Sequence, residues 1–159
     1  MKKQGFTLIE LMVVIVIMGI LAAVAVPKLF GMIAKSKASE VPTAAGTYIS
    51  LQDAYAVEAA AIGSWQKIGY TGPGASSQSG STTANFTYKE AASSPQWSAI
   101  AAKKLNDCTA GKKWTLSAAA SANNDADGSH YDVAYTAGGD GECTGLTPSF
   151  AQLTSGRNE

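Results

Sequence analysis

The first 27 residues constrain this chain more than any other part, because they combine a membrane-length apolar run with one charge. The sequence from Phe6 to Val26 is almost entirely apolar. As an α-helix, these 21 residues span about 30 Å, the thickness of the hydrocarbon core of a bilayer. Glu10 is the only charged residue in the run. A carboxylate at membrane depth typically costs about 2.5–3.5 kcal/mol, so Glu10 needs a partner or a role.

Three interpretations of the run are open. It resembles a secretory signal peptide in its basic start and in Ala23-Val24-Ala25, which fits a cleavage site after Ala25. It is also long enough for an uncleaved membrane anchor, with the N-terminus in the cytoplasm because Lys2 and Lys3 precede it. Both interpretations leave Glu10 unexplained. In the third, the chain is cut before the apolar run rather than after it.

The stretch KKQGFTLIE at positions 2–10 favours the third interpretation. It resembles the short basic leader and the mature start of type IV pilins of the type IVa kind. The likeness continues through Gly19 and Pro27. It implies that a prepilin peptidase removes residues 1–5 by cutting between Gly5 and Phe6, and that the new amine of Phe6 is methylated.

Cleavage at that position supplies a partner for Glu10. The free amine of Phe6 is mostly cationic at neutral pH and lies in the same apolar layer as the Glu10 carboxylate. Each charge alone is expensive in that layer, and the two together largely cancel. The resemblance implies that the pair forms between neighbouring subunits, so that Glu10 directs docking and sets the axial stagger.

The resemblance implies an α+β pilin fold, in which a long kinked N-terminal helix packs on a C-terminal antiparallel β-sheet. Residues 6–27 form the membrane and filament-core half of the helix, 28–62 its amphipathic half, and 63–159 the globular domain. Apolar residues three or four apart from Phe30 to Ile62 support the second half. Gly19 and Pro27 predict a kink, and the family implies unwinding between them on assembly. Pro42 predicts a further kink.

The middle of the chain offers weaker patterns. Residues 69–83 are rich in Gly, Ser and Thr and predict a surface loop. Ser94-Pro95 fits a helix start. Trp97, Ile100, Ala101 and Leu105 would then lie along one side of the helix.

The last third predicts a β-hairpin from residues 113–121 and 130–137, around the turn composition of residues 123–128. With the turn centred between Asp125 and Ala126, Trp114 opposes Ala137 and Leu116 opposes Tyr135, so one face is apolar. The same register opposes Cys108 and Cys143, the only cysteines. In an oxidising periplasm such a pair predicts a disulfide, which adds on the order of 3–4 kcal/mol of stability.

The turn also resembles the opening of an EF-hand loop, with Asn123, Asp125 and Asp127 as calcium candidates. Its closing glutamate is missing, because position twelve is Ala134, so an ordinary turn without metal is expected. His130, the only histidine, lies on the polar face of the predicted hairpin, and no catalytic triad or cofactor is expected. Removal of Lys2 and Lys3 leaves 10 basic against 12 acidic residues, a net charge of −2, so no nucleic-acid binding by the monomer is expected.

These features together predict a structural subunit, not an enzyme. The first hypothesis is a major pilin that crosses the inner membrane once, meets the pilus assembly platform there, and polymerises with itself into an extracellular pilus. A minor pilin or a pseudopilin of type II secretion is the alternative within the same class. Two alternatives belong to other functional classes. They are a secreted binding domain cut after Ala25 and a membrane-anchored enzyme.

Overall fold

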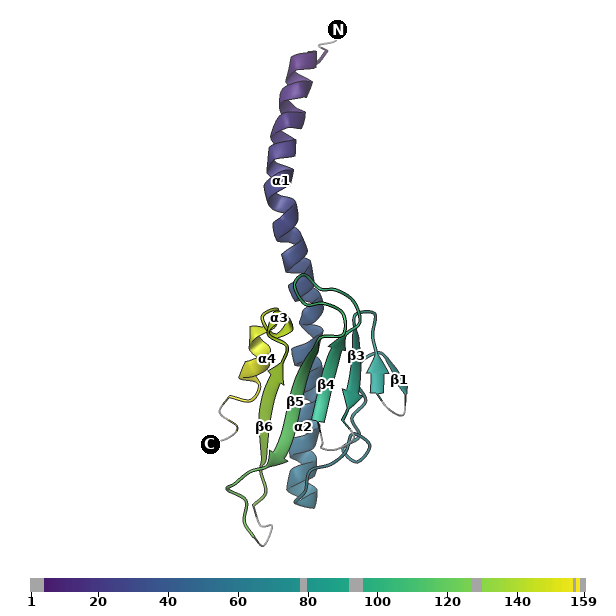
Figure 1. Cartoon of the computed structure of the whole chain (residues 1–159), viewed down its shortest axis with the longest axis vertical. Coiled ribbons are helices and arrows are strands. Elements are labelled where there is room, and N and C mark those ends of the chain that lie inside the picture. The colour runs from purple at the N-terminus through teal and green to yellow at the C-terminus, as the bar shows by residue number, and fades with distance from the viewer. Residues whose placement is uncertain (1–4, 78–79, 92–95, 127–129, 156, 158–159) are drawn as a thin grey trace. The chain divides into compact units, whose positions relative to one another are not determined.

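The computed structural model describes residues 5–77, 80–91, 96–126, 130–155 and 157. It divides into two compact units, unit 1 (Met1–Ile33) and unit 2 (Ala34–Glu159). The helices and strands of the chain are labelled in Figure 1. They are α1 (Leu8–Ala38), α2 (Glu40–Ala59), β1 (Ala75–Ser77), β2 (Gly80–Thr82), β3 (Phe86–Glu90), β4 (Gln96–Ala101), β5 (Lys113–Ala120), β6 (Val133–Gly139), α3 (Gly141–Thr144) and α4 (Pro148–Gln152).

The predicted α+β fold class is confirmed. Two long helices precede a six-stranded antiparallel sheet with the order β1-β2-β3-β4-β5-β6, so each strand pairs with the next strand along the chain. Within unit 2, α2 runs along one face of the sheet (Figure 1). The buried side of α2 consists of Val41, Ala44, Ala45, Tyr48, Ile49, Gln52 and Ala56.

Large aromatic side chains fill the core of unit 2. Trp97, Trp114, Tyr88 and Tyr135 are fully buried. The ring centroids of Trp97 and Tyr88 lie 5.6 Å apart. Such contacts between aromatic rings add stability beyond the area they bury.

The prediction of a helix that begins at Ser94-Pro95 is wrong, because Gln96–Ala101 forms strand β4. Its buried side chains alternate as Trp97, Ala99 and Ala101, the period of two expected of a strand. Positions 99–101 are all apolar (Ala-Ile-Ala), so the alternation of buried and exposed residues is not visible in the sequence, and the apolar residues also fit helical spacing. Ser94 and Pro95 themselves lie outside the described residues.

Residues 69–83 were predicted to form one surface loop, and this prediction is wrong. The segment contains strands β1 and β2. The small residues here permit close packing instead of solvation. Gly80 has φ +150°, and a β-carbon there would lie 2.1 Å from the carbonyl oxygen of Tyr88. A β-carbon at Gly72 would lie 2.1 Å from the hydroxyl oxygen of the buried Ser81. Composition alone does not show such pairing with a later strand.

The β5–β6 hairpin is present, but its predicted register is wrong by two residues. Trp114 pairs with Gly139 and Leu116 with Ala137. The connection is longer than predicted, because Asn124 binds the backbone N–H and carbonyl of Asp132, at 2.6 and 3.1 Å, and β6 begins only after it. A slip of two residues keeps every side chain on its predicted face. Trp114, Leu116 and Ala118 are accordingly buried.

The helical stretch is interrupted once, at Ser39, between α1 and α2. Pro42 lies one turn later and has no N–H to donate to the carbonyl of Ala38, four residues earlier. Helix α2 ends at Ala59, three residues before the predicted end at Ile62. The next residue, Ala60, adopts a left-handed φ of 46° and caps the helix.

Candidate functional site

The start of α1 gives Glu10 a partner within its own chain. Thr7 precedes the first helical residue, and its N–H and hydroxyl both donate to Oε2 of Glu10, at 2.8 and 2.7 Å. The N–H of Glu10 donates back to the Thr7 hydroxyl at 3.3 Å. This reciprocal arrangement is a capping box, which satisfies backbone donors that a helix start leaves open. The sequence signal, Thr7-Leu8-Ile9-Glu10, was overlooked in the sequence analysis.

The apolar side chains of unit 1 are exposed. Every Val, Ile, Leu, Met and Phe from Phe6 to Ile33 exposes between 41% and 90% of its surface. Helix α1 is long and apolar enough to cross a membrane by length and composition. An apolar surface of this extent marks contact with lipid or with other protein. Glu10 is thus a charge near one end of a segment built for an apolar environment.

Gly19 and Pro27 both lie inside the continuous helix α1. A β-carbon at Gly19 would meet nothing within 4 Å, so packing within the subunit does not explain this glycine. Pro27 removes one hydrogen bond from the helix interior, and Gly19 disfavours helix by about 1 kcal/mol relative to alanine. The predicted kink and the unwinding on assembly remain predictions.

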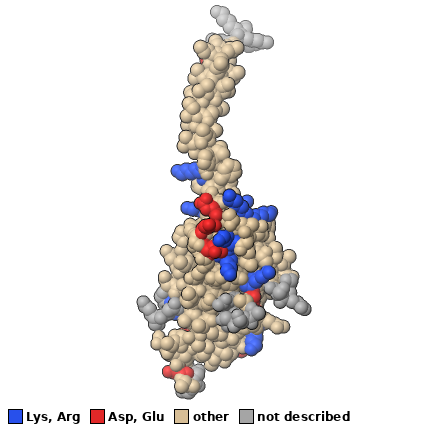
Figure 2. Space-filling model, viewed as in Figure 1, with Lys and Arg blue, Asp and Glu red and all other residues tan. Residues whose placement is uncertain are grey.

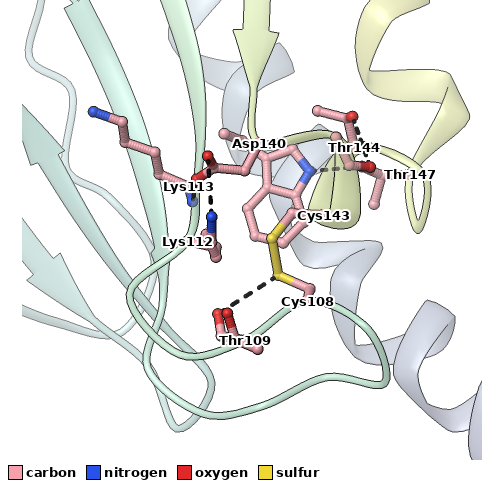
Figure 3. Close-up of a disulfide and its surroundings, with 10 residues drawn as sticks. Cys108, Thr109, Lys112, Lys113, Asp140, Cys143, Thr144 and Thr147 are labelled. Carbon is pink, nitrogen blue, oxygen red and sulfur yellow. Dashed lines mark hydrogen bonds and ion pairs between the residues drawn. A yellow bond between two sulfur atoms is a disulfide. The ribbon is translucent and has the colours of Figure 1, made fainter.

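The predicted disulfide between Cys108 and Cys143 is present and joins two segments at one end of the sheet (Figure 3). Cys143 lies in helix α3, not in a continuation of β6, so the agreement with the predicted register was a coincidence. Neighbouring bonds hold the same segments. Asp140 Oδ2 accepts from the N–H of Lys113 at 2.9 Å, and the indole N–H of Trp114 donates to the hydroxyl of Thr147 at 2.8 Å.

The described residues contain no cluster of three or more side chains able to hold a metal ion. Asp127, one of the three calcium candidates, lies outside the described residues. Of the turn's amides, Asn124 rather than Asn123 makes the side-chain bonds across to Asp132. His130 Nε2 lies 2.9 Å from Asp132 Oδ2 on an exposed surface. Ser129, the third residue considered for a triad, also lies outside the described part of the chain.

Two tyrosine–carboxylate bonds tie α2 to the sheet. The hydroxyl of Tyr88 donates to Glu40 at 2.8 Å, and that of Tyr135 donates to Asp53 at 2.6 Å. Arg157 forms an ion pair with the same aspartate. The sequence analysis missed these bonds, and no local signal marks them, because the partners are 48 and 82 residues apart.

These tyrosines are held neutral. Burial, and then the bond to Glu40, raises the pKa of Tyr88, and burial followed by the bond to Asp53 raises the pKa of Tyr135. Burial raises the pKa of Tyr70 to about 12. A tyrosine has a pKa of about 10 in the unfolded chain, and these tyrosines have a higher pKa in the folded chain. Each one therefore stabilises the fold fully below about pH 10, and this stabilisation is lost as the pH rises through the folded pKa.

We therefore expect unit 2 to unfold cooperatively between about pH 10 and about 12, as its buried tyrosines ionise. Tyrosinate absorbance should rise in a steep step that coincides with the loss of the near-ultraviolet circular dichroism signal. A gradual ionisation of all tyrosines near pH 10, with the dichroism signal unchanged, would contradict this expectation.

Comparison with known proteins singles out the same N-terminal segment. The family model described as "Prokaryotic N-terminal methylation motif" matches residues 1–26. The chain is 55% identical over 42 residues to the type IV major pilin protein PilA of Myxococcus xanthus, which covers 26% of this chain and 19% of that protein. It is 52% identical over 44 residues to the type IV major fimbrial protein FimA of Dichelobacter nodosus, which covers 28% of each chain.

A third relative matches over a longer stretch. The chain is 38% identical over 82 residues to the type IV narrow pilus major component PilA5 of Thermus thermophilus. That match covers 52% of this chain and 70% of the Thermus protein. The likeness to the Myxococcus and Dichelobacter proteins, by contrast, spans less than a third of either one.

Proposed function

Because the chain belongs to the type IV pilin family, we propose that it is the major structural subunit of a type IV pilus. The observation that carries the proposal is the start of α1. An exposed apolar helix begins there at Leu8, two residues after Phe6, and its first turn holds the one charge of the apolar run in a capping box. The relatives are named as major pilus or fimbrial components, which favours a major over a minor pilin or a pseudopilin.

Processing follows from the same segment. Prepilin peptidase cuts between Gly5 and Phe6, removes residues 1–5, and leaves a Phe6 amine that is then methylated. Lys2 and Lys3 keep the leader on the cytoplasmic side, because positive charges favour that side. Before assembly the subunit spans the inner membrane once, through residues 6–27, and meets the assembly platform there.

Assembly moves this helix from lipid into a core formed by the helices of other copies. Lipid tails are as apolar as the side chains of α1, so the hydrophobic effect gives this transfer little direction. The pairing of Glu10 with the Phe6 amine of a neighbour supplies the direction. The capping box lowers the free energy gained from this pairing, because Glu10 already accepts two hydrogen bonds from Thr7. The incoming amine either replaces these bonds or shares the Glu10 carboxylate with Thr7.

Unit 2 supplies the exterior of the filament. The helix leaves the apolar filament core after residue 27 and ends at Ala59, and the sheet of unit 2 forms the outer surface of the filament. The disulfide suits an oxidising location outside the inner membrane. A structural role needs no cofactor, and the named relatives are pilus and fimbrial proteins.

Mass spectrometry of the protein taken from cells tests the proposal. The expected N-terminus is N-methyl-Phe6, and filaments sheared from the cell surface should consist mainly of this chain. An N-terminus at Val26 would indicate a secreted domain, and an intact Met1 would indicate a plain membrane anchor. Correctly processed chain that never appears in surface filaments would favour a pseudopilin.

A further inference from the structure

A chain of four aromatic side chains runs through the core of unit 2 from Trp65 to Tyr88. The ring centroids of Trp65 and Tyr70 lie 4.7 Å apart, and those of Trp97 and Tyr88 lie 5.6 Å apart. Between these two pairs, the indole N–H of Trp97 donates to the Tyr70 hydroxyl at 2.9 Å. Each step is therefore a close contact between an indole and a phenol, the two aromatic side chains that are oxidised most easily.

The residues of this chain differ in the partners of their polar groups. Trp65 is 7% exposed, and its indole N–H has no hydrogen-bond partner among the described residues. Tyr70 donates to the backbone carbonyl of Ala44 at 3.1 Å, and a carbonyl is a poor proton acceptor. Tyr88 is fully buried and donates at 2.8 Å to the carboxylate of Glu40, a half-buried residue at the start of α2. Tyr88 therefore has a partner that can take its proton.

The partner of the phenol proton decides where an oxidised chain comes to rest. Loss of one electron makes a phenol strongly acidic, and a base within hydrogen-bond reach takes the proton as the electron leaves. Burial, and then the bond to Glu40, raises the pKa of Tyr88, so the neutral phenol is the form that is oxidised. A phenol that loses its proton in the same step is a better reductant than an indole or a phenol that keeps it. The bond from Tyr88 to Glu40 thus makes Tyr88 the favoured final position of the oxidation.

We propose that Tyr88 and Glu40 form a redox site, reached through the aromatic chain from Trp65, whose substrates are one-electron oxidants in solution. An oxidant takes one electron from Trp65 and is itself reduced. One electron then moves along the chain from Tyr88 to Trp65, which returns to its original state. The phenol proton of Tyr88 moves to Glu40, so the products are a neutral tyrosyl radical and a protonated carboxyl group. A reductant that supplies one electron restores the site, and the proton returns to Tyr88.

A test needs an oxidant whose approach does not depend on surface charge. Basic and acidic side chains lie close together on the face of unit 2 seen in Figure 2. A charged oxidant would be attracted to some parts of such a surface and repelled from others. The azidyl radical is small and neutral and takes one electron from indoles. Pulse radiolysis of an azide solution produces it, and the absorbances of the indolyl and tyrosyl radicals then follow the reaction.

The reference sample is the full-length chain in mild detergent, with the half-buried Tyr55 and Tyr131 replaced by phenylalanine to remove direct oxidation near the surface. The indolyl signal is expected to decay as the tyrosyl signal rises. Both changes should share one first-order rate that does not depend on protein concentration, because the transfer is intramolecular. Heavy water should lower this rate, because a proton moves in the same step.

Two variants of the reference chain test the roles of the site residues. Tyr88→Phe should abolish the rise of the tyrosyl signal. Glu40→Gln keeps an oxygen that accepts the hydrogen bond but is a far weaker base, so it should slow the transfer at least roughly tenfold. Tyr135→Phe is the matched control and should leave the rate unchanged, because it makes the same change at the other tyrosine–carboxylate bond. Each variant is first shown to unfold in a cooperative thermal transition.

The possible results separate the inference from its alternatives. A tyrosyl signal of full size in Tyr88→Phe would place the radical on another tyrosine and overturn the inference. Equal rates in Glu40→Gln and the reference chain would show that Glu40 does not take the proton, and would also overturn it. If Tyr88→Phe does not fold, the rates of Glu40→Gln and of the reference chain in heavy water still decide. None of these measurements depends on filament assembly, so the proposed function is tested separately.

Discussion

A chain carrying Glu10→Gln is expected to accumulate as mature subunit at the normal level but to yield at least about tenfold less surface filament. Glutamine keeps the acceptor oxygen, so it still closes the capping box with Thr7, while the negative charge is lost. Under the proposed pairing, the Phe6 amine of a neighbouring copy would then be buried without a counter-charge. Removing one partner of a buried ion pair typically costs about 3–5 kcal/mol. Quantitative immunoblots of total subunit and sheared filament from the same cells measure the effect.

Thr7→Val is the matched control for this experiment. It keeps the charge of Glu10 and removes the hydroxyl that both donates to Glu10 and accepts from its N–H. Loss of an N-cap typically costs about 1 kcal/mol, so filament yield should fall by less than about tenfold. Cleavage after Gly5 should survive in Glu10→Gln. If Thr7→Val assembled more poorly than Glu10→Gln, the cap rather than the charge would be the main role of Glu10.

The candidate site shows both the reach and the limit of sequence reasoning. The offset of Glu10 from the Gly5-Phe6 junction was enough to predict a processed, membrane-embedded start. The capping box was equally visible, since a threonine three residues before a glutamate ahead of an apolar run is a known helix-start signal. The tyrosine–carboxylate bonds of α2 were not visible, because the partners, such as Tyr135 and Asp53, lie 82 residues apart in the sequence.

The sequence predictions of the fold were wrong where pairing between strands, rather than the local sequence pattern, determines the structure. Composition predicted a loop where β1 and β2 form, because glycine and serine are usual in loops and the pairing of β2 with β3 is tertiary. In the β5–β6 hairpin the faces were predicted correctly. The register was missed because the bonds of Asn124 to Asp132 lengthen the connection. The cysteine pairing was predicted correctly on grounds of count and compartment.

Trp97, placed on a helix by its spacing, lies at the centre of the core, and its replacement is expected to be the most damaging single change in unit 2. The side chain is fully buried, and its N–H donates to the Tyr70 hydroxyl at 2.9 Å. That hydroxyl donates in turn to the carbonyl of Ala44 on α2 at 3.1 Å. Trp97→Ala leaves a large cavity and breaks this link, which should cost about 3–5 kcal/mol.

The loss should appear as a fall of roughly 10–20 °C in the unfolding temperature of the full-length chain in mild detergent, followed by near-ultraviolet circular dichroism. Trp97→Phe should cost about 1–3 kcal/mol, because it keeps a ring but leaves Tyr70 without its donor. Trp65→Phe is the control, since the indole N–H of Trp65 is buried and has no hydrogen-bond partner among the described residues. Its removal deletes an unsatisfied donor and should change stability least. Equal losses from Trp97→Phe and Trp65→Phe would show that the bond to Tyr70 contributes nothing and that ring size alone stabilises the contact between α2 and the sheet.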